Sequence, residues 1–240
     1  MNVWKGAWFL AKHELAKDRW KSLISLLIVG YLLLFTVPLF LDANSDETGS
    51  INWAMDFVYL TILPCLAFCF NQSMMRYWKN DAYTHKIAQW RTMPISSKQI
   101  AIGRLIQLTI VLFVTQLVFF SLQYLIVYMN DVNISIGYFA LYGLLWFAYS
   151  LTIASMYVYW ELGHTGKTYF IMNLLYILLY LILTLCLALL KIGNIVITSL
   201  HFIEDGNGWI VLVALAITAL ALFIGMKRIE NRLEKRSYRA

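Results

Sequence analysis

The chain has 240 residues, of which 61% are hydrophobic and 13% are charged, and its net charge is +6. Soluble domains carry roughly 25% charged residues, so this composition excludes a soluble globular protein and indicates an integral membrane protein. The cations do not indicate nucleic-acid binding, because they border long apolar segments, where anionic membrane lipid is the expected partner.

Residues 1–21 predict a helix that lies along the membrane surface. On a helical wheel the apolar residues share one broad arc, and Lys5, Lys12 and Arg19 line its edge. Indoles at headgroup depth and cations that reach toward phosphates are typical of interfacial amphipathic helices. Glu14 and Asp18 fall inside the arc, so a simple charged flank of the first span is the alternative.

Six segments approach or exceed the length of about 20 apolar residues that a spanning helix needs. They are approximately residues 23–41, 53–70, 100–128, 136–160, 169–190 and 209–226. Backbone groups in lipid must pair within their own segment, and no segment alternates like a strand, so the fold class is an all-α membrane protein with six transmembrane helices. Pro38 and Pro64 are expected to kink the first two spans. No repeat or linker divides residues 1–240, which predicts one transmembrane domain.

The positions of Lys and Arg predict the orientation of the chain. All but one of the 19 basic residues fall in the N-terminal flank, the loops after the second and fourth spans, and the tail at 227–240. The opposite side keeps only Lys191 as a cation. It gathers the acids Asp42, Asp46, Glu47, Asp131, Glu204 and Asp205. By the positive-inside rule both termini are cytoplasmic, in a multi-pass protein of the cell membrane.

Residues 71–99 form a cytosolic segment that is too long for a simple turn. This segment and the start of the third span carry Arg76, Lys79, Lys86, Arg91, Lys98 and Arg104, against the acid Asp81. Tyr83, Ile87 and Trp90 recur at helical spacing, which predicts a short amphipathic helix over about 82–91. Such a helix can anchor its aromatic side in a groove on a partner protein, or it can rest on lipid. The residues alone do not decide between the two.

The sequence WRTMPISSKQI at residues 90–100 carries a family resemblance. Pro94 breaks the preceding helix, and Ser96 with Gln99 predicts a capping box that opens the third span. The stretch resembles the L-P-[IVL]-S-[RK] sequence before the third span of ABC-2 type permeases, the membrane subunits of a class of ATP-driven exporters. Met93 stands where Leu is commoner. Six spans, cytoplasmic termini and a Trp-bearing basic N-terminal helix extend the agreement over nearly the whole chain.

The resemblance implies that the 71–99 segment is a coupling segment seated on a separate ABC ATPase, with Tyr83, Ile87, Trp90 and Arg91 at the contact. It implies two ATPase copies that carry ATP and Mg, a second permease copy or a related permease, and no cofactor in this chain. The implied function is export of an amphiphilic or peptide cargo. The alternative is a non-transporting membrane sensor, assembly factor or immunity protein that binds a cytosolic partner through its basic loop.

Residues 192–208 are too apolar for a loop that sits in water. Gly193 and Asn194 break the fifth span, and residues 204–208 close the excursion with two further glycines. A re-entrant or interfacial hairpin on the outer side is predicted. An extension of the fifth span is the alternative.

Uncharged polar stripes on the third to fifth spans predict a candidate translocation path. Its residues are Thr109, Gln116, Gln123, Tyr142, Tyr149, Asn173, Tyr176 and Tyr180. The absence of charge argues against a proton relay or an ion-coupled path and favours an amphiphilic cargo. Hydrogen bonding between helices is the alternative interpretation of the stripes. Asp56, one turn into the second span, is expected at the outer interface.

Neither catalysis nor metal binding is indicated. The chain's His13, His85, His164 and His201 are scattered over both sides, and Cys65, Cys69 and Cys186 lack other metal-ligating residues. The run GHTGKT at 163–168 lacks the first glycine of a phosphate-binding loop, because Glu161 stands there. We therefore expect a chain that is not an enzyme and does not itself bind ATP.

Overall fold

The computed structural model describes residues 2–17, 22–44, 52–68, 87–90, 92, 95–190 and 194–235. Within these ranges the regular structure is helical, which confirms an all-α protein. Five helices are long and apolar enough to cross a membrane, namely α2 (Ser22–Asn44), α5 (Ser97–Met129), α6 (Ile136–Gly163), α7 (Gly166–Leu189) and α9 (Trp209–Lys235). The shorter helices are α1 (Val3–Lys17), α3 (Asn52–Cys65) and α8 (Ile195–Glu204).

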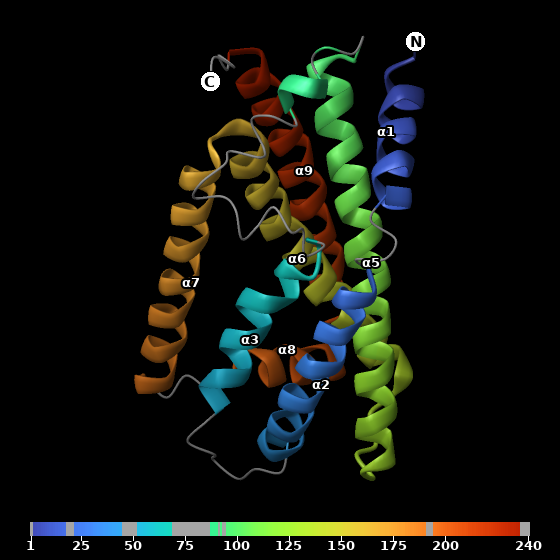
Figure 1. Cartoon of the computed structure of the whole chain (residues 1–240). Helices are drawn as coiled ribbons and strands as arrows, with labels where there is room; N and C mark the ends of the chain where they lie inside the picture. The colour runs from blue at the N-terminus through green and yellow to red at the C-terminus, as the bar shows by residue number, and fades with distance from the viewer. Residues whose placement is uncertain are drawn as a thin grey trace.

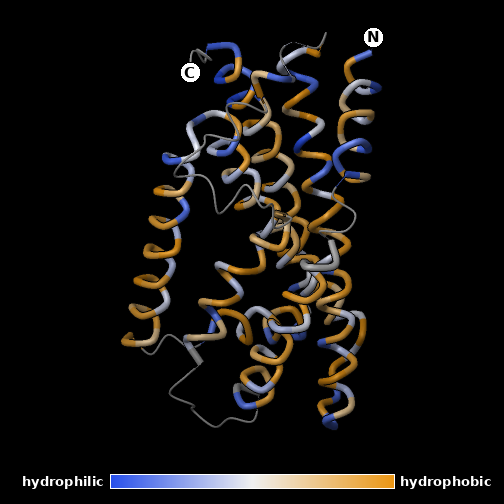
Figure 2. The backbone as a smooth tube through the Cα atoms, in the orientation of Figure 1, coloured by the Kyte–Doolittle hydropathy of each residue, from blue (hydrophilic) through white to orange (hydrophobic). Residues whose placement is uncertain are grey.

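The long helices run up and down one bundle, and both chain termini lie at the same end of it (Figure 1). This end, called the terminal end below, also holds α1, the start of α5 and the last turns of α6 and α9. The opposite, far end holds the start of α3 and the short helix α8. Hydrophilic residues gather at the terminal end, and hydrophobic residues follow the helices between the ends (Figure 2). This distribution is that of a multi-pass membrane protein.

Helix α3 is shorter than the predicted second span. It has 14 residues and ends at Cys65, after which Ala67 and Phe68 donate to carbonyls three residues back. Pro64 has no N–H for the carbonyl of Leu60, so one bond of the last turn is missing, and the bonds of Ala67 and Phe68 then follow the tighter 3₁₀ pattern. At 1.5 Å per residue α3 covers only about 21 Å, less than the ~30 Å of a hydrocarbon core. A sixth span is therefore not confirmed in the described part of the chain.

Helix α5 begins with the predicted capping box. The Ser96 hydroxyl accepts from the Gln99 amide at 3.3 Å, and the Gln99 side chain accepts from the Ser96 amide at 2.9 Å. These two bonds satisfy backbone donors that the first turn of a helix cannot pair internally. The helix starts at Ser97, earlier than the apolar run, and continues for 33 residues.

Helix α1 stands alongside the first half of α5 (Figure 1). Its buried residues form one face, consisting of Gly6, Ala7, Leu10, Ala11 and Glu14. A side-chain carbon added at Gly103 of α5 would lie 3.0 Å from the Ala7 carbonyl oxygen, so this glycine permits the close approach. Trp4 and Trp8 remain largely exposed. A helix in this segment is confirmed, while its position at the membrane surface stays a prediction.

Helix α8 and the turn after it form the excursion at the far end (Figure 1). The side-chain oxygen of Asn194 accepts from the amides of Val196 and Ile197, which caps the helix. Val196, Ile197, Leu200 and Ile203 are buried. Gly206 then adopts a φ of +90°, a left-handed conformation that favours glycine, before α9 begins. Insertion of this helix into a membrane as a re-entrant hairpin stays a prediction.

Candidate functional site

The segment predicted to dock an ATPase is described over residues 87–90 and at residue 92. Ile87 and Trp90 lie in one helical turn and are buried in the chain's own core, with 1% and 7% of their surfaces exposed. Gln89, between them, is exposed. Tyr83 and Arg91 lie outside the described residues. Ile87 and Trp90 therefore attach the segment to the helices of this chain. Contact of these two residues with an ATPase stays a prediction.

An ion pair connects α5 to α6 near the terminal end. Nη2 of Arg104 lies 2.9 and 3.0 Å from the two carboxylate oxygens of Glu161, and Nε lies 3.3 Å from the second oxygen. Nη1 donates to the side chain of Gln107 at 2.7 Å. Glu161 is 4% exposed, so a two-pronged pair of this kind is strongly held.

The sequence groups Arg104 with the cations of the cytosolic loop, whereas in the structure it lies two turns inside α5. Helices α5 and α6 therefore carry one charged pair near their terminal ends, which the uncharged stripes did not indicate. A signal for this pair was present in the sequence. Arg104 is the charge nearest the start of the third span and Glu161 the charge nearest the end of the fourth, and these two ends lie on the same side when neighbouring spans are antiparallel. Opposite charges at matching depth in adjacent helices tend to pair.

A second bond connects α9 to the same place. Nε of Arg232 donates to the carbonyl oxygen of Gly163 at 3.2 Å. This carbonyl is at the last residue of α6, where backbone acceptors lack partners within the helix and attract cations. We call Arg104, Gln107, Glu161, Gly163 and Arg232 the terminal-end joint. It connects α5, α6 and α9.

Two residues of the predicted path lie around Tyr59 of α3. The Tyr59 hydroxyl donates to Oε1 of Gln123 at 2.9 Å and accepts from its Nε2 at 2.7 Å. Tyr142 lies beside this pair, with ring centres of Tyr59 and Tyr142 6.5 Å apart. Gln123 and Tyr142 are fully buried. The bonds between Tyr59 and Gln123 are hydrogen bonds between helices of the kind that the alternative interpretation of the stripes expects.

Three further path residues line the contact of α6 with α3 and α7. The Tyr149 hydroxyl donates to the carbonyl of Leu60 at 3.0 Å, the acceptor that Pro64 leaves without a helical donor. Tyr176 accepts from the indole of Trp160 at 3.2 Å. Tyr180 is buried as well.

The remaining path residues lie elsewhere. Thr109 donates to the Leu105 carbonyl within α5 and lines a separate hollow of about 500 Å³ beside α1 and α9. Asn173 on α7 is half-buried. Gln116 lines a groove between α5 and α6. The structure thus divides the predicted path among several places, and a continuous path across the membrane stays a prediction.

Asp56 has a structural partner that the sequence did not reveal. Its two carboxylate oxygens accept from the amides of Ile195 and Val196, each at 3.0 Å. The residue is 2% exposed, so it is covered by protein, and its depth at the outer interface stays a prediction. A carboxylate is stabilised at a helix N-terminus by free amides and by the helix dipole. Asp56 therefore fastens α8 onto α3.

Comparison of the chain with protein-family models, with curated proteins and with solved structures gives no match.

Proposed function

We propose that this chain is the six-span permease subunit of an ABC-2 type exporter, and that it moves an amphiphilic or peptide cargo out of the cell. Two copies of a separate ATPase supply the energy from ATP and Mg, and a second permease completes the pathway. Both termini face the cytoplasm in this proposal. The support is the sequence at residues 90–100, its resemblance to these permeases, and the way in which the structure attaches that region to the bundle.

The observation that carries the proposal is the burial of Ile87 and Trp90. Because both side chains belong to the core, a force applied to the segment before α5 acts directly on the membrane helices. Gln89 faces outward in the same turn, so one side of the turn is attached and the other is available to a partner. A segment of this kind suits the transmission of movement.

The terminal-end joint extends this argument to other helices. Since Arg104 pairs with Glu161 and Arg232 bonds to Gly163, the ends of α5, α6 and α9 are bonded to one another, and we propose that they move as a group. Closure of the ATPases on ATP would tilt these three helices as a group and shift the population between inward-open and outward-open states. Uncharged polar groups along α5 to α7 fit an amphiphilic cargo better than an ion.

The test is co-purification of the tagged full-length chain from its own cells in mild detergent. The expected result is an ATPase subunit with a phosphate-binding loop, whose ATP hydrolysis changes on reconstitution with the chain. Tyr83→Ala and Arg91→Glu should release that subunit without lowering the unfolding temperature of the chain. Arg228→Glu is the matched control, because it makes the same charge reversal at an exposed position of α9, outside the 71–99 segment.

Two results would overturn the proposal. One is the absence of any nucleotide-hydrolysing subunit from the purified material. The other is retention of that subunit by both docking variants. Recovery of a cytosolic regulator without ATPase activity would instead support the sensor, assembly or immunity function.

A further inference from the structure

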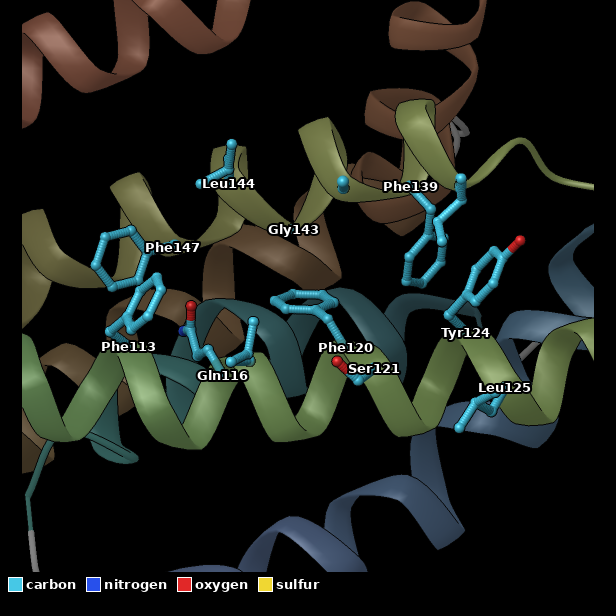
Figure 3. A pocket seen from close by; sticks show the side chains of 13 residues that line it. Phe113, Gln116, Phe120, Ser121, Tyr124, Leu125, Phe139, Gly143, Leu144 and Phe147 are labelled. Atoms are coloured by element: carbon cyan, nitrogen blue, oxygen red, sulfur yellow. The ribbon is translucent and has the colours of Figure 1, made fainter.

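A groove of about 560 Å³ runs between α5 and α6 in the half of the bundle toward the far end (Figure 3). Its walls are aromatic, with Phe113 and Phe120 on α5 and Phe139 and Phe147 on α6. Ligand pockets commonly measure about 300–1,000 Å³ and combine apolar walls with a few placed polar groups. The groove therefore has the size and lining of a site for a small molecule.

Its rim shows where an occupant would come from. Leu117 and Leu125 on one side and Ile136 on the other are more than half exposed. All three are apolar, and they lie on helices long enough to span a membrane. The groove therefore opens toward the hydrocarbon of the bilayer, and a membrane-dissolved molecule can enter it from the side.

One polar group in the wall lacks a partner. The side chain of Gln116 points from α5 toward α6, between Phe113 and Phe120 (Figure 3). It is 2% exposed, and neither its nitrogen nor its oxygen has a hydrogen-bond partner in the part of the chain that the structure describes. A buried amide without partners costs roughly 1–3 kcal/mol. Its last torsion is broad, so the amide can turn toward an occupant at little cost.

The combination of an apolar groove and an unsatisfied amide limits the kinds of molecule that can occupy the groove. A lipid tail fills the groove but leaves Gln116 without partners. A buried water needs about two to four polar partners, and the aromatic walls offer few. A helix from a second copy is about 10 Å wide and cannot reach an amide that lies between two contacting helices. An alkyl chain that carries a group able both to donate and to accept satisfies all these conditions.

We infer that the α5–α6 groove binds one amphiphile with an alkyl chain and an amide group, the chain among the phenylalanines and the amide paired with Gln116. The inference does not depend on the proposed exporter function, because it concerns binding to this chain alone. It therefore assigns a specific role to Gln116, which differs from that of the hydrogen-bonded Gln123 on the same face of α5.

The test is photolabelling of the purified full-length chain in lipid nanodiscs. The probe is a medium-chain primary alkyl amide with a diazirine on its chain, and an alkane of the same length with the same diazirine is its partner probe. The expected result is amide labelling of the peptides that contain Phe113, Phe120 or Phe139. Unlabelled amide should compete about threefold to tenfold better than unlabelled alkane, the value of one or two hydrogen bonds.

Three variants make the result specific. Gln116→Leu should remove the advantage of the amide over the alkane while alkane labelling persists. Gly143→Leu should abolish labelling by both probes. The first side-chain carbon at this position would lie 3.4 Å from the Phe120 ring, so a leucine would fill the groove there. Ala140→Leu, at an exposed position of the same wall, serves if Gly143→Leu does not fold. Gly225→Leu narrows a different hollow, beside Ser155 and Arg228, and should leave labelling unchanged.

Equal competition by amide and alkane that Gln116→Leu does not alter would overturn the inference and identify a plain lipid groove. Labelling spread evenly over exposed α7 and α9 would overturn it as well. Protection of the groove by crosslinks between two copies of the chain would show that a second copy covers it, which also contradicts the inference.

Discussion

Pro64 and Tyr149 are two residues whose roles explain each other. Pro64 has no amide hydrogen, so the Leu60 carbonyl has no helical donor, and the Tyr149 hydroxyl donates to it from α6. We expect Tyr149→Phe to lower the free energy of unfolding by about 1 kcal/mol, since a buried carbonyl loses its partner. The measurement is denaturation of the purified chain in mixed micelles.

The matched control is Tyr157→Phe. It removes a hydroxyl from the same helix, two turns away, for which the described residues show no hydrogen bond, so it should cost less. Pro64→Ala restores an amide that can donate to Leu60. In that background Tyr149→Phe should be nearly neutral, and an undiminished cost there would contradict the explanation.

At the scale of residues, the sequence predicts contacts that are local along the chain. The capping box of Ser96 and Gln99 spans three residues, so a helix-start pattern was enough to identify it. Pro64 was recognised equally locally, but as a kink within a span, whereas α3 ends one residue after it. The bond of Tyr149 to Leu60 joins residues 89 apart, and the pair of Arg104 with Glu161 joins residues 57 apart. Such contacts depend on how helices pack, which one sequence does not specify.

The N-terminus of α8 is held by two side-chain acceptors, one from its own cap residue and one from α3. Asn194 caps it locally, and Asp56 of α3 accepts from Ile195 and Val196. We expect Asp56→Leu to speed hydrogen exchange at the first amides of α8 about tenfold or more, because free amides at a loosened helix end exchange through local opening. Exchange is followed by mass spectrometry of peptides that cover α8.

The matched control removes an acid at the other end of the same helix. Glu204→Leu breaks a contact with His201 at 3.2 Å and should leave exchange at the first turn unchanged. Asp56→Asn keeps an acceptor and should give an intermediate rate. If Asp56→Leu exchanges like the unaltered chain, Asp56 does not hold α8.

Helices with long apolar runs were predicted well. Helices whose length or surroundings depend on contacts with another part of the chain were not. The spans at α2, α5, α6, α7 and α9 follow from length and composition, which a hydropathy pattern reports. Helix α3 ends before its apolar run does. A hydropathy pattern cannot show this, because it does not register that Pro64 lacks an amide hydrogen. In α1, the apolar arc was assigned to lipid, yet Ala7 and Leu10 face α5 across Gly103. An apolar face does not reveal whether lipid or protein covers it.

Helices of the bundle are bonded to one another at both ends, and the kind of bond differs between the two ends. Charged hydrogen bonds of the terminal-end joint tie α5, α6 and α9, while the Asp56 carboxylate ties α8 to α3 at the far end. Helix α7 contacts α3 and α6 and leaves most of its side chains exposed. The polar cluster around Tyr59 and the groove beside Gln116 lie between these attachments. Movement at the terminal end would thus reach the groove through α5 and α6.

The orientation of this bundle decides which end a cytosolic partner can reach. Both termini lie at the terminal end, and the positive-inside rule, applied to the positions of Lys and Arg in the sequence, predicts that this end faces the cytoplasm. We expect a cysteine at Asn133, in the exposed loop between α5 and α6, to react with a membrane-impermeant maleimide on intact cells. Cysteines at Asn2 and Lys235 should react only after the cells are permeabilised.

The background for this measurement is a chain with Cys65, Cys69 and Cys186 replaced by alanine, so that each variant carries one thiol. A chain that inserts in the opposite sense would reverse the pattern, with Asn2→Cys and Lys235→Cys labelled on intact cells. That result would put the terminal-end joint and the segment before α5 outside the cell, where no ATP-driven subunit could act on them. Labelling of Asn2→Cys but not Lys235→Cys would show an odd number of crossings. The first outcome would rule out coupling to a cytosolic ATPase, and the second would rule out a six-span topology.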